Sequence, residues 1–235
     1  MTDYGKDEAE FDRYAEDYDA ALAQGLSVSG EDKNFFARGR IAFLAACLAR
    51  LPYEAPRAVL DFGCGTGSAT PFLLDLLRAE SVLGVDVSAA SLSVARRDFG
   101  DARARFLPPG EAPPSADRDL AHCNGVFHHI PPAERPAAVR YVAESLRPGG
   151  LFAFWENNPW NPGTRYVMDR CPFDGDAVTL TPPEAQALLQ SGGLEIVRTD
   201  FLFLFPRLLR ALRPVEPWVS RLPLGAQYQV LCRKA

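Results

Sequence analysis

The chain has 235 residues, of which 47% are hydrophobic, and this suits a single α/β domain with a full core. A formal net charge of −5 argues against a large nucleic-acid-binding surface, and no apolar stretch approaches the ~20 residues of a membrane-spanning helix. Five scattered cysteines without a C-x-x-C pair, behind an acidic N-terminal stretch unlike a signal peptide, predict a cytoplasmic protein with reduced thiols and no metal site.

The first part of the chain is predicted to form a helical cap, residues 1–54, ahead of one domain over residues 55–235. Apolar side chains at helical spacing indicate a helix over 7–23. A Gly/Ser loop over 24–32 follows, and Asp32 is a candidate N-cap for a second helix that reaches about Leu51.

Strand and helix patterns alternate from residue 58 onward. Strands are expected at 58–61, 82–86, 104–107, 119–124, 151–155, 194–205 and 227–232. Helices are expected at 68–79, after Ser88 as an N-cap, at 132–146 and at 182–191. An irregular insert is expected over 156–180. This alternation implies a parallel sheet with right-handed crossovers. The last two strands have no helix between them, so we expect an antiparallel pair at the edge.

A glycine-rich turn joins the first predicted strand to the helix that follows it. The strand ends at Asp61, and glycines then stand at positions 63, 65 and 67. Glycine has no Cβ, so such a turn lets the backbone approach a ligand in the crevice at the carboxyl ends of parallel strands. The dinucleotide fingerprint is G-x-G-x-x-G/A, whereas here the third glycine comes one residue early and Ser68 occupies the last position. The second strand ends at Asp86, whose carboxylate can accept two charge-assisted hydrogen bonds from a ribose diol.

The run D-x-G-x-G-x-G over 61–67 resembles motif I of the class I S-adenosylmethionine (SAM)-dependent methyltransferases. Residues 11–19 read F-D-x-x-A-x-x-Y-D and are similar to the ubiquinone/menaquinone-biosynthesis-type branch. The resemblance implies a Rossmann-like α/β fold: a seven-stranded mixed sheet in the order 3-2-1-4-5-7-6, its last strand antiparallel, with helices on both faces. It also implies SAM as cofactor and S-adenosylhomocysteine as product.

The same resemblance suggests residues that hold the cofactor. After the third strand the family often has an acidic residue at the adenine, but this chain has Pro108-Pro109-Gly110-Glu111, so backbone groups there and Glu111 are candidates. Cys64 is expected to pack, because no histidine stands near it in sequence. The candidate cofactor-binding residues are Tyr18, Asp61, Gly63, Cys64, Gly65, Thr66, Gly67, Asp86, Val87, Ser88, Gly110, Glu111, Asn124 and Gly125.

Candidates for the chemistry follow the fourth and fifth strands. Residues 123–130 resemble the family's motif IV, and within them His128 and His129 are candidate bases because histidine titrates near neutral pH. Glu156 is another candidate base; the alternative for each histidine is a structural hydrogen bond. The candidate acceptor-binding residues are Phe11, Tyr14, Asn157, Asn158, Trp160 and Arg165.

Residues 201–213 combine apolar and basic residues. The first five are expected to complete a strand buried on both faces. Arginines then recur every third residue at 207, 210 and 213 beside leucines, which on a helix gives a basic and an apolar stripe. Such a segment suits either weak contact with a membrane surface or an ordinary amphipathic surface helix.

We therefore expect SAM-dependent methyl transfer to a small-molecule or lipid-linked acceptor, with an oxygen acceptor slightly favoured. A hydroxyl acceptor would need a base, whereas a carboxylate would not. Two alternatives stay open: a non-catalytic SAM-binding interaction protein, and a nicotinamide-dependent oxidoreductase, which the early third glycine disfavours.

Overall fold

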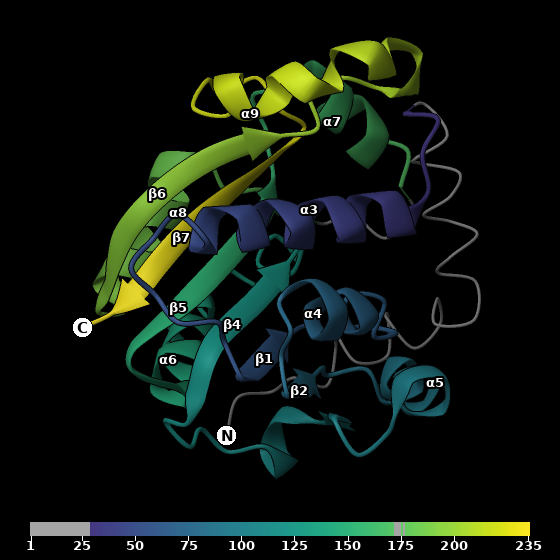
Figure 1. Cartoon of the computed structure of the whole chain (residues 1–235). Helices are drawn as coiled ribbons and strands as arrows, with labels where there is room; N and C mark the ends of the chain where they lie inside the picture. The colour runs from purple at the N-terminus through teal and green to yellow at the C-terminus, as the bar shows by residue number, and fades with distance from the viewer. Residues whose placement is uncertain (1–28, 172–174, 176) are drawn as a thin grey trace.

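The computed structural model describes residues 29–171, 175 and 177–235 (Figure 1). Its centre is a seven-stranded sheet in the order β3-β2-β1-β4-β5-β7-β6. Strands β1 to β5 run parallel, and β7 lies antiparallel between β5 and the edge strand β6. The predicted order and the antiparallel edge pair are confirmed. The strands are β1 Ala58–Phe62, β2 Ser81–Val85, β3 Ala104–Leu107, β4 Arg118–Asn124, β5 Leu146–Asn157, β6 Leu194–Leu202 and β7 Gln227–Lys234.

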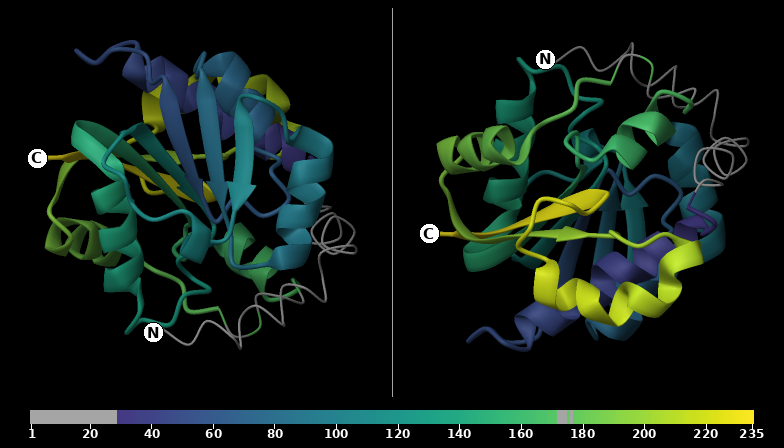
Figure 2. Two further views of the ribbon diagram at one scale, coloured as in Figure 1. Left: turned by 90° about the horizontal axis from the view of Figure 1, so that it is seen from below. Right: turned by 90° about the horizontal axis from the view of Figure 1, so that it is seen from above.

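Helices cover both faces of this sheet (Figure 2). On one face, Ile41 and Leu44 of α3 and Leu73 of α4 share a buried cluster with Val59 and Trp155 of the strands. On the other face, α6 and α8 pack in a second cluster with Leu60, Phe152 and Phe154. The α-helices are α3 Lys33–Leu48, α4 Thr70–Leu76, α5 Ala89–Phe99, α6 Arg135–Ser145, α7 Pro162–Met168, α8 Pro182–Ser191 and α9 Glu216–Val219, and the 3-10 helices are η1 Pro109–Glu111 and η2 Arg207–Val215.

Local capping explains where several helices begin. Asp32 Oδ1 accepts the Phe35 N–H at 2.7 Å, and Ser88 Oγ accepts the Ser91 N–H at 3.1 Å, so both predicted N-caps are present. The insert over 156–180 is less irregular than predicted, because Asn161 caps α7 by accepting the Thr164 N–H at 3.0 Å. The pair Asn161-Pro162 is a helix start signal, with an N-cap residue followed by proline at the first helical position. Helix α6 begins at Arg135 rather than at 132, after a turn closed by Glu134 N–H to Pro131 O at 2.8 Å.

Strand β6 ends at Leu202, three residues earlier than predicted. Phe203 has a left-handed φ of 62°, which breaks the extended backbone. The N–H groups of Phe203 and Phe205 donate to the Glu216 carboxylate, at 3.2 and 2.9 Å, instead of joining the sheet. The chain therefore turns off the sheet edge and continues into η2.

The predicted helix over 7–23 and the candidates Phe11, Tyr14 and Tyr18 lie outside the described residues. The division of the chain at residue 54 stays a prediction, although α3 packs in the same buried cluster as β1 and α4. No helix in the described part of the chain is both long and apolar enough to cross a membrane.

Candidate functional site

The glycine loop after β1 takes a backbone course that other residues adopt only with strain. Gly63, Gly65 and Gly67 have φ values of 70°, 51° and 77°. A Cβ on Gly63 would lie 2.2 Å from Val126 Cγ2, and one on Gly67 would lie 3.0 Å from Phe99 Cδ2. At Gly65, nothing lies within 4 Å of the Cβ position. The outer glycines are therefore needed for packing, whereas Gly65 faces open space.

Asp86 joins this loop to the end of β2. Its Oδ2 accepts the Gly65 N–H at 2.8 Å, and its Oδ1 accepts the Ser88 N–H at 2.9 Å. Burial raises the pKa of the Asp86 carboxyl above its usual value, and the N–H groups of Ser88 and Gly65 oppose that rise. Each oxygen keeps a lone pair, so the carboxylate can serve a ligand while it holds the loop.

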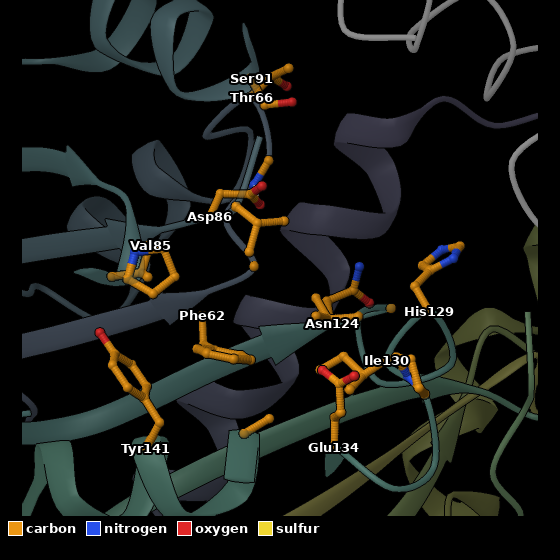
Figure 3. A pocket seen from close by; sticks show the side chains of 18 residues that line it. Phe62, Thr66, Val85, Asp86, Ser91, Asn124, His129, Ile130, Glu134 and Tyr141 are labelled. Atoms are coloured by element: carbon orange, nitrogen blue, oxygen red, sulfur yellow. The ribbon is translucent and has the colours of Figure 1, made fainter. Parts of the chain in front are cut away.

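A first cavity opens at the carboxyl ends of β1, β2 and β4. Figure 3 shows Asp86, Asn124 and His129 around it, each from a different loop or strand end. The Oδ1 of Asn124 is buried, and within the described part of the chain it has no hydrogen-bond partner. The predicted residues that line this cavity are Gly63, Gly65, Thr66, Asp86, Val87, Asn124 and Gly125. Residues that we did not predict also line it, among them Phe62, Ser91, Ile130, Glu134 and Tyr141.

A second cavity adjoins the first. Both are lined by Thr66, Asn124, Gly125 and His129, so the two spaces meet at these residues. The second cavity has a volume of about 380 Å³, which suits a small-molecule ligand. Segments far apart in sequence form its walls: the start of α3, His128, Asn157, helix α7, residues 203–206 and the start of β7.

Positive charge predominates in the second cavity. Its lining includes Lys33, Arg40 and Arg213, and Glu31 is the one carboxylate among the described lining residues. Arg40 is only 8% exposed and donates through Nη1 to Gln227 Oε1 at 2.8 Å. Arg213 pairs with Glu31 at 2.9 Å. The cavity therefore suits an anionic ligand.

A buried pair of His128 and Glu156 stands behind the second cavity. His128 Nδ1 lies 2.6 Å from Glu156 Oε2, and Glu156 Oε1 accepts the Phe127 N–H at 2.8 Å. Burial alone would raise the pKa of Glu156, but His128 and the Phe127 N–H together hold it below its usual value. His128 lines the second cavity and His129 lines both, whereas Glu156 lines neither.

Several predicted cofactor residues lie around the first cavity without lining it. The Asp61 side chain pairs with His122 of β4: the Asp61 Oδ1 lies 2.7 Å from the His122 Nδ1, and both side chains are buried. Cys64 packs with Leu92 and Phe106, and burial raises its pKa well above the usual value, which makes it unsuitable as a nucleophile. Gly67 and Ser88 do not line the cavity either. After β3 the cavity is lined by Pro109, not by Gly110 or Glu111.

Of the candidate acceptor-binding residues after the fifth strand, only some line the second cavity. Asn157 lines the second cavity, but Asn158, Trp160 and Arg165 do not. Asn158 is buried, and its side-chain amide donates to Gly225 O at 2.8 Å. It therefore joins the end of β5 to the residues just before β7. Arg40 was missed, although its position gave a signal: it is a cation within the buried stripe of α3 that includes Ala37, Ile41, Leu44 and Leu48.

The glycine loop yields a first prediction. Gly63→Ala should lower the free energy of unfolding by about 2–5 kcal/mol, because it adds overpacking against Val126 to left-handed backbone strain. Gly65→Ala should lower the free energy of unfolding by only about 1–2 kcal/mol, through backbone strain. It should nevertheless weaken cofactor binding, because Gly65 lines the first cavity and the added methyl group would occupy space there. Chemical denaturation and calorimetry with S-adenosylhomocysteine would measure the two effects. Equal stability losses in both variants would contradict the distinction.

Comparisons with known proteins agree with this geometry. A family model described as a methyltransferase domain matches residues 60–152. A trans-aconitate 2-methyltransferase of Delftia acidovorans is 28% identical over 194 residues, which cover 71% of this chain and 70% of that protein. One from Methylobacterium nodulans is 37% identical over 123 residues, 50% of this chain and 45% of the relative, so the match spans less than half of that protein.

Solved structures share the fold at low sequence identity. A SAM-dependent methyltransferase from Mesorhizobium loti has a TM-score of 0.58 at 22% identity, covering 82% of this chain and 98% of that one. A possible histamine N-methyltransferase from Thermotoga maritima has a TM-score of 0.63 at 18% identity, covering 97% and 99%. The domain match, the sequence relatives, the glycine-loop motif and the sheet order together support a class I SAM-dependent methyltransferase.

Proposed function

We propose that this chain methylates an oxygen of a small, carboxylate-bearing acceptor, with the cofactor in the first cavity and the acceptor in the second. The observation that carries the proposal is the junction of the two cavities at Thr66, Asn124, Gly125 and His129. Bound SAM supplies a methyl group on a sulfonium ion. Adjoining cavities hold the two reactants in contact and exclude water, and such positioning accounts for much of the rate of a two-substrate reaction.

The first cavity has the groups that an adenosyl cofactor needs. Asp86 lines this cavity and offers two carboxylate oxygens for the ribose hydroxyls. Gly65 leaves room for the loop backbone to approach the ligand. The buried Asn124 Oδ1 is an acceptor at the junction and suits a ligand N–H donor.

The second cavity favours a carboxylate over a hydroxyl acceptor. Lys33, Arg40 and Arg213 suit carboxylate groups, and an arginine can bind one through two parallel hydrogen bonds. The relatives that act on trans-aconitate, judged by their names, support the same class of acceptor. A carboxylate is already ionised at neutral pH, so its methylation removes no proton.

This acceptor changes the role that we assign to the histidines and Glu156. An ionised, buried Glu156 favours positive charge on His128, its partner at 2.6 Å. We therefore assign His128 as a hydrogen-bond donor to acceptor oxygens and Glu156 as the residue that positions it. His129, at the junction, would contact both ligands.

The test combines binding with turnover. Calorimetry should show one-site binding of S-adenosylhomocysteine and none of NAD. S-adenosylhomocysteine should form with di- and tricarboxylic acids and not with their amides. Arg40→Gln should raise KM for the acids about tenfold or more, since it removes a charge-assisted hydrogen bond, while cofactor affinity stays unchanged.

Different failures point to different explanations. Cofactor binding without turnover on the whole acid panel would favour a non-catalytic SAM-binding protein. Binding of NAD instead would favour an oxidoreductase. Equal turnover of acids and amides would remove the carboxylate assignment but leave methyl transfer standing.

A further inference from the structure

The connection between β6 and β7, residues 206–224, exposes an unusual amount of apolar surface. In the parts of the chain that the structure describes, ten large apolar side chains are exposed, and seven of them lie in this connection. Leu208 is 93% and Trp218 is 87% exposed. A concentration of exposed apolar side chains in one segment is typical of an interaction site. The seven are Leu208, Leu209, Leu212, Val215, Trp218, Leu222 and Leu224.

The exposed charge of the connection is positive. Arg207, Arg210 and Arg221 are exposed. Glu216 is the only acidic residue in 206–224, and its carboxylate turns inward to accept the N–H groups of Phe203 and Phe205. A chain with a net charge of −5 therefore presents here a surface that is both apolar and cationic. This combination is complementary to an anionic lipid surface.

The connection is held against the protein on its inner side. The Arg207 N–H donates to Ser29 O at 2.9 Å, and Ser220 Oγ donates to the buried Asp200 at 2.9 Å. Arg213 points inward, to Glu31 and the second cavity. Pro206, the first residue of the connection, and Phe205 before it also line that cavity. In Figure 1 the connection forms an outer edge of the molecule above β6 and β7.

We propose that residues 206–224 form a membrane-contact element that docks the protein on an anionic bilayer. Leu208 and Trp218 enter the boundary between headgroups and acyl chains, where an amphipathic indole is favoured. Arg207 and Arg210 contact lipid phosphates. Docking in this way brings the second cavity close to the bilayer surface, because Pro206 and Arg213 of this element line that cavity. The proposal does not depend on the identity of the acceptor.

Sedimentation with vesicles tests this element. The full chain should bind vesicles of phosphatidylglycerol and phosphatidylcholine at low salt, bind less at high salt, and bind phosphatidylcholine alone weakly. Leu208→Ser with Trp218→Ser should reduce partitioning about tenfold or more. Arg207→Gln with Arg210→Gln should reduce it roughly 30-fold, because each surface cation contributes about fivefold.

Matched controls use exposed residues elsewhere. Val178→Ser and Arg140→Gln should bind vesicles like the unmodified chain. Unchanged circular dichroism and S-adenosylhomocysteine affinity would show that each variant folds. No binding of the unmodified chain to anionic vesicles at low salt would overturn the proposal. So would self-association that Trp218→Ser abolishes without any vesicle binding, because the surface would then be a protein interface.

Discussion

Asp86→Ala is expected to weaken S-adenosylhomocysteine binding at least about 100-fold, the largest effect of any single substitution in the first cavity. A hydrogen bond to a charged group contributes about 1.5–3 kcal/mol, and the ribose diol would lose two of them. The substitution also removes the acceptor of the Gly65 and Ser88 N–H groups, so the loop itself loosens. Calorimetric titration measures the change directly.

Two further variants sharpen this result. Asp86→Asn keeps the size of the side chain. In the unmodified protein each carboxylate oxygen accepts a main-chain N–H, so in the variant one of these N–H groups would face an amide NH₂ group. We expect its affinity to fall as well. Asp75→Ala removes an exposed carboxylate of α4 and should leave affinity unchanged. Unaltered affinity in Asp86→Ala would refute the ribose assignment.

Glu156→Gln is expected to lower acceptor turnover about 10- to 100-fold while cofactor affinity stays within about twofold. The amide can still accept the Phe127 N–H, but it no longer supplies the negative charge that orients His128. The free energy of unfolding should fall by about 1–3 kcal/mol, because a buried partner group is left poorly satisfied. Full turnover in this variant would show that the pair is structural only.

The pH dependence of stability gives an independent check on this pair. The folded state lowers the pKa of Glu156, so the carboxylate contributes stability above the unfolded pKa of about 4.3 and loses it as the pH falls through the lower folded value. The difference in stability between the unmodified chain and Glu156→Gln should therefore be full at pH 7 and shrink below about pH 4. Denaturant titrations at both pH values would show it; a difference that grows in acid would contradict the ionised assignment.

Features that depend on neighbouring residues could be predicted from the sequence alone. The caps at Asp32 and Ser88, strand 104–107 and helix 182–191 follow from side chains and spacing within a few residues. The glycine loop and Asp86 belong to this group, because the strand-turn-strand spacing already placed them at one sheet edge. These local signals were enough to predict the sheet order by resemblance and the place of the first cavity.

Only the tertiary structure decided the second cavity and the roles within it. Its walls come from segments nearly 200 residues apart, so no local pattern marks Arg40 and Gln227 as neighbours. Glu156 lies near the end of β5, where both faces of the strand are buried, and it pairs with His128 in the turn after β4. The end of β6 likewise depends on Glu216, which takes the N–H groups that the sheet would have used. Local preference acts through the nearest residues, whereas burial, charge pairing and cavity shape arise only when distant segments meet.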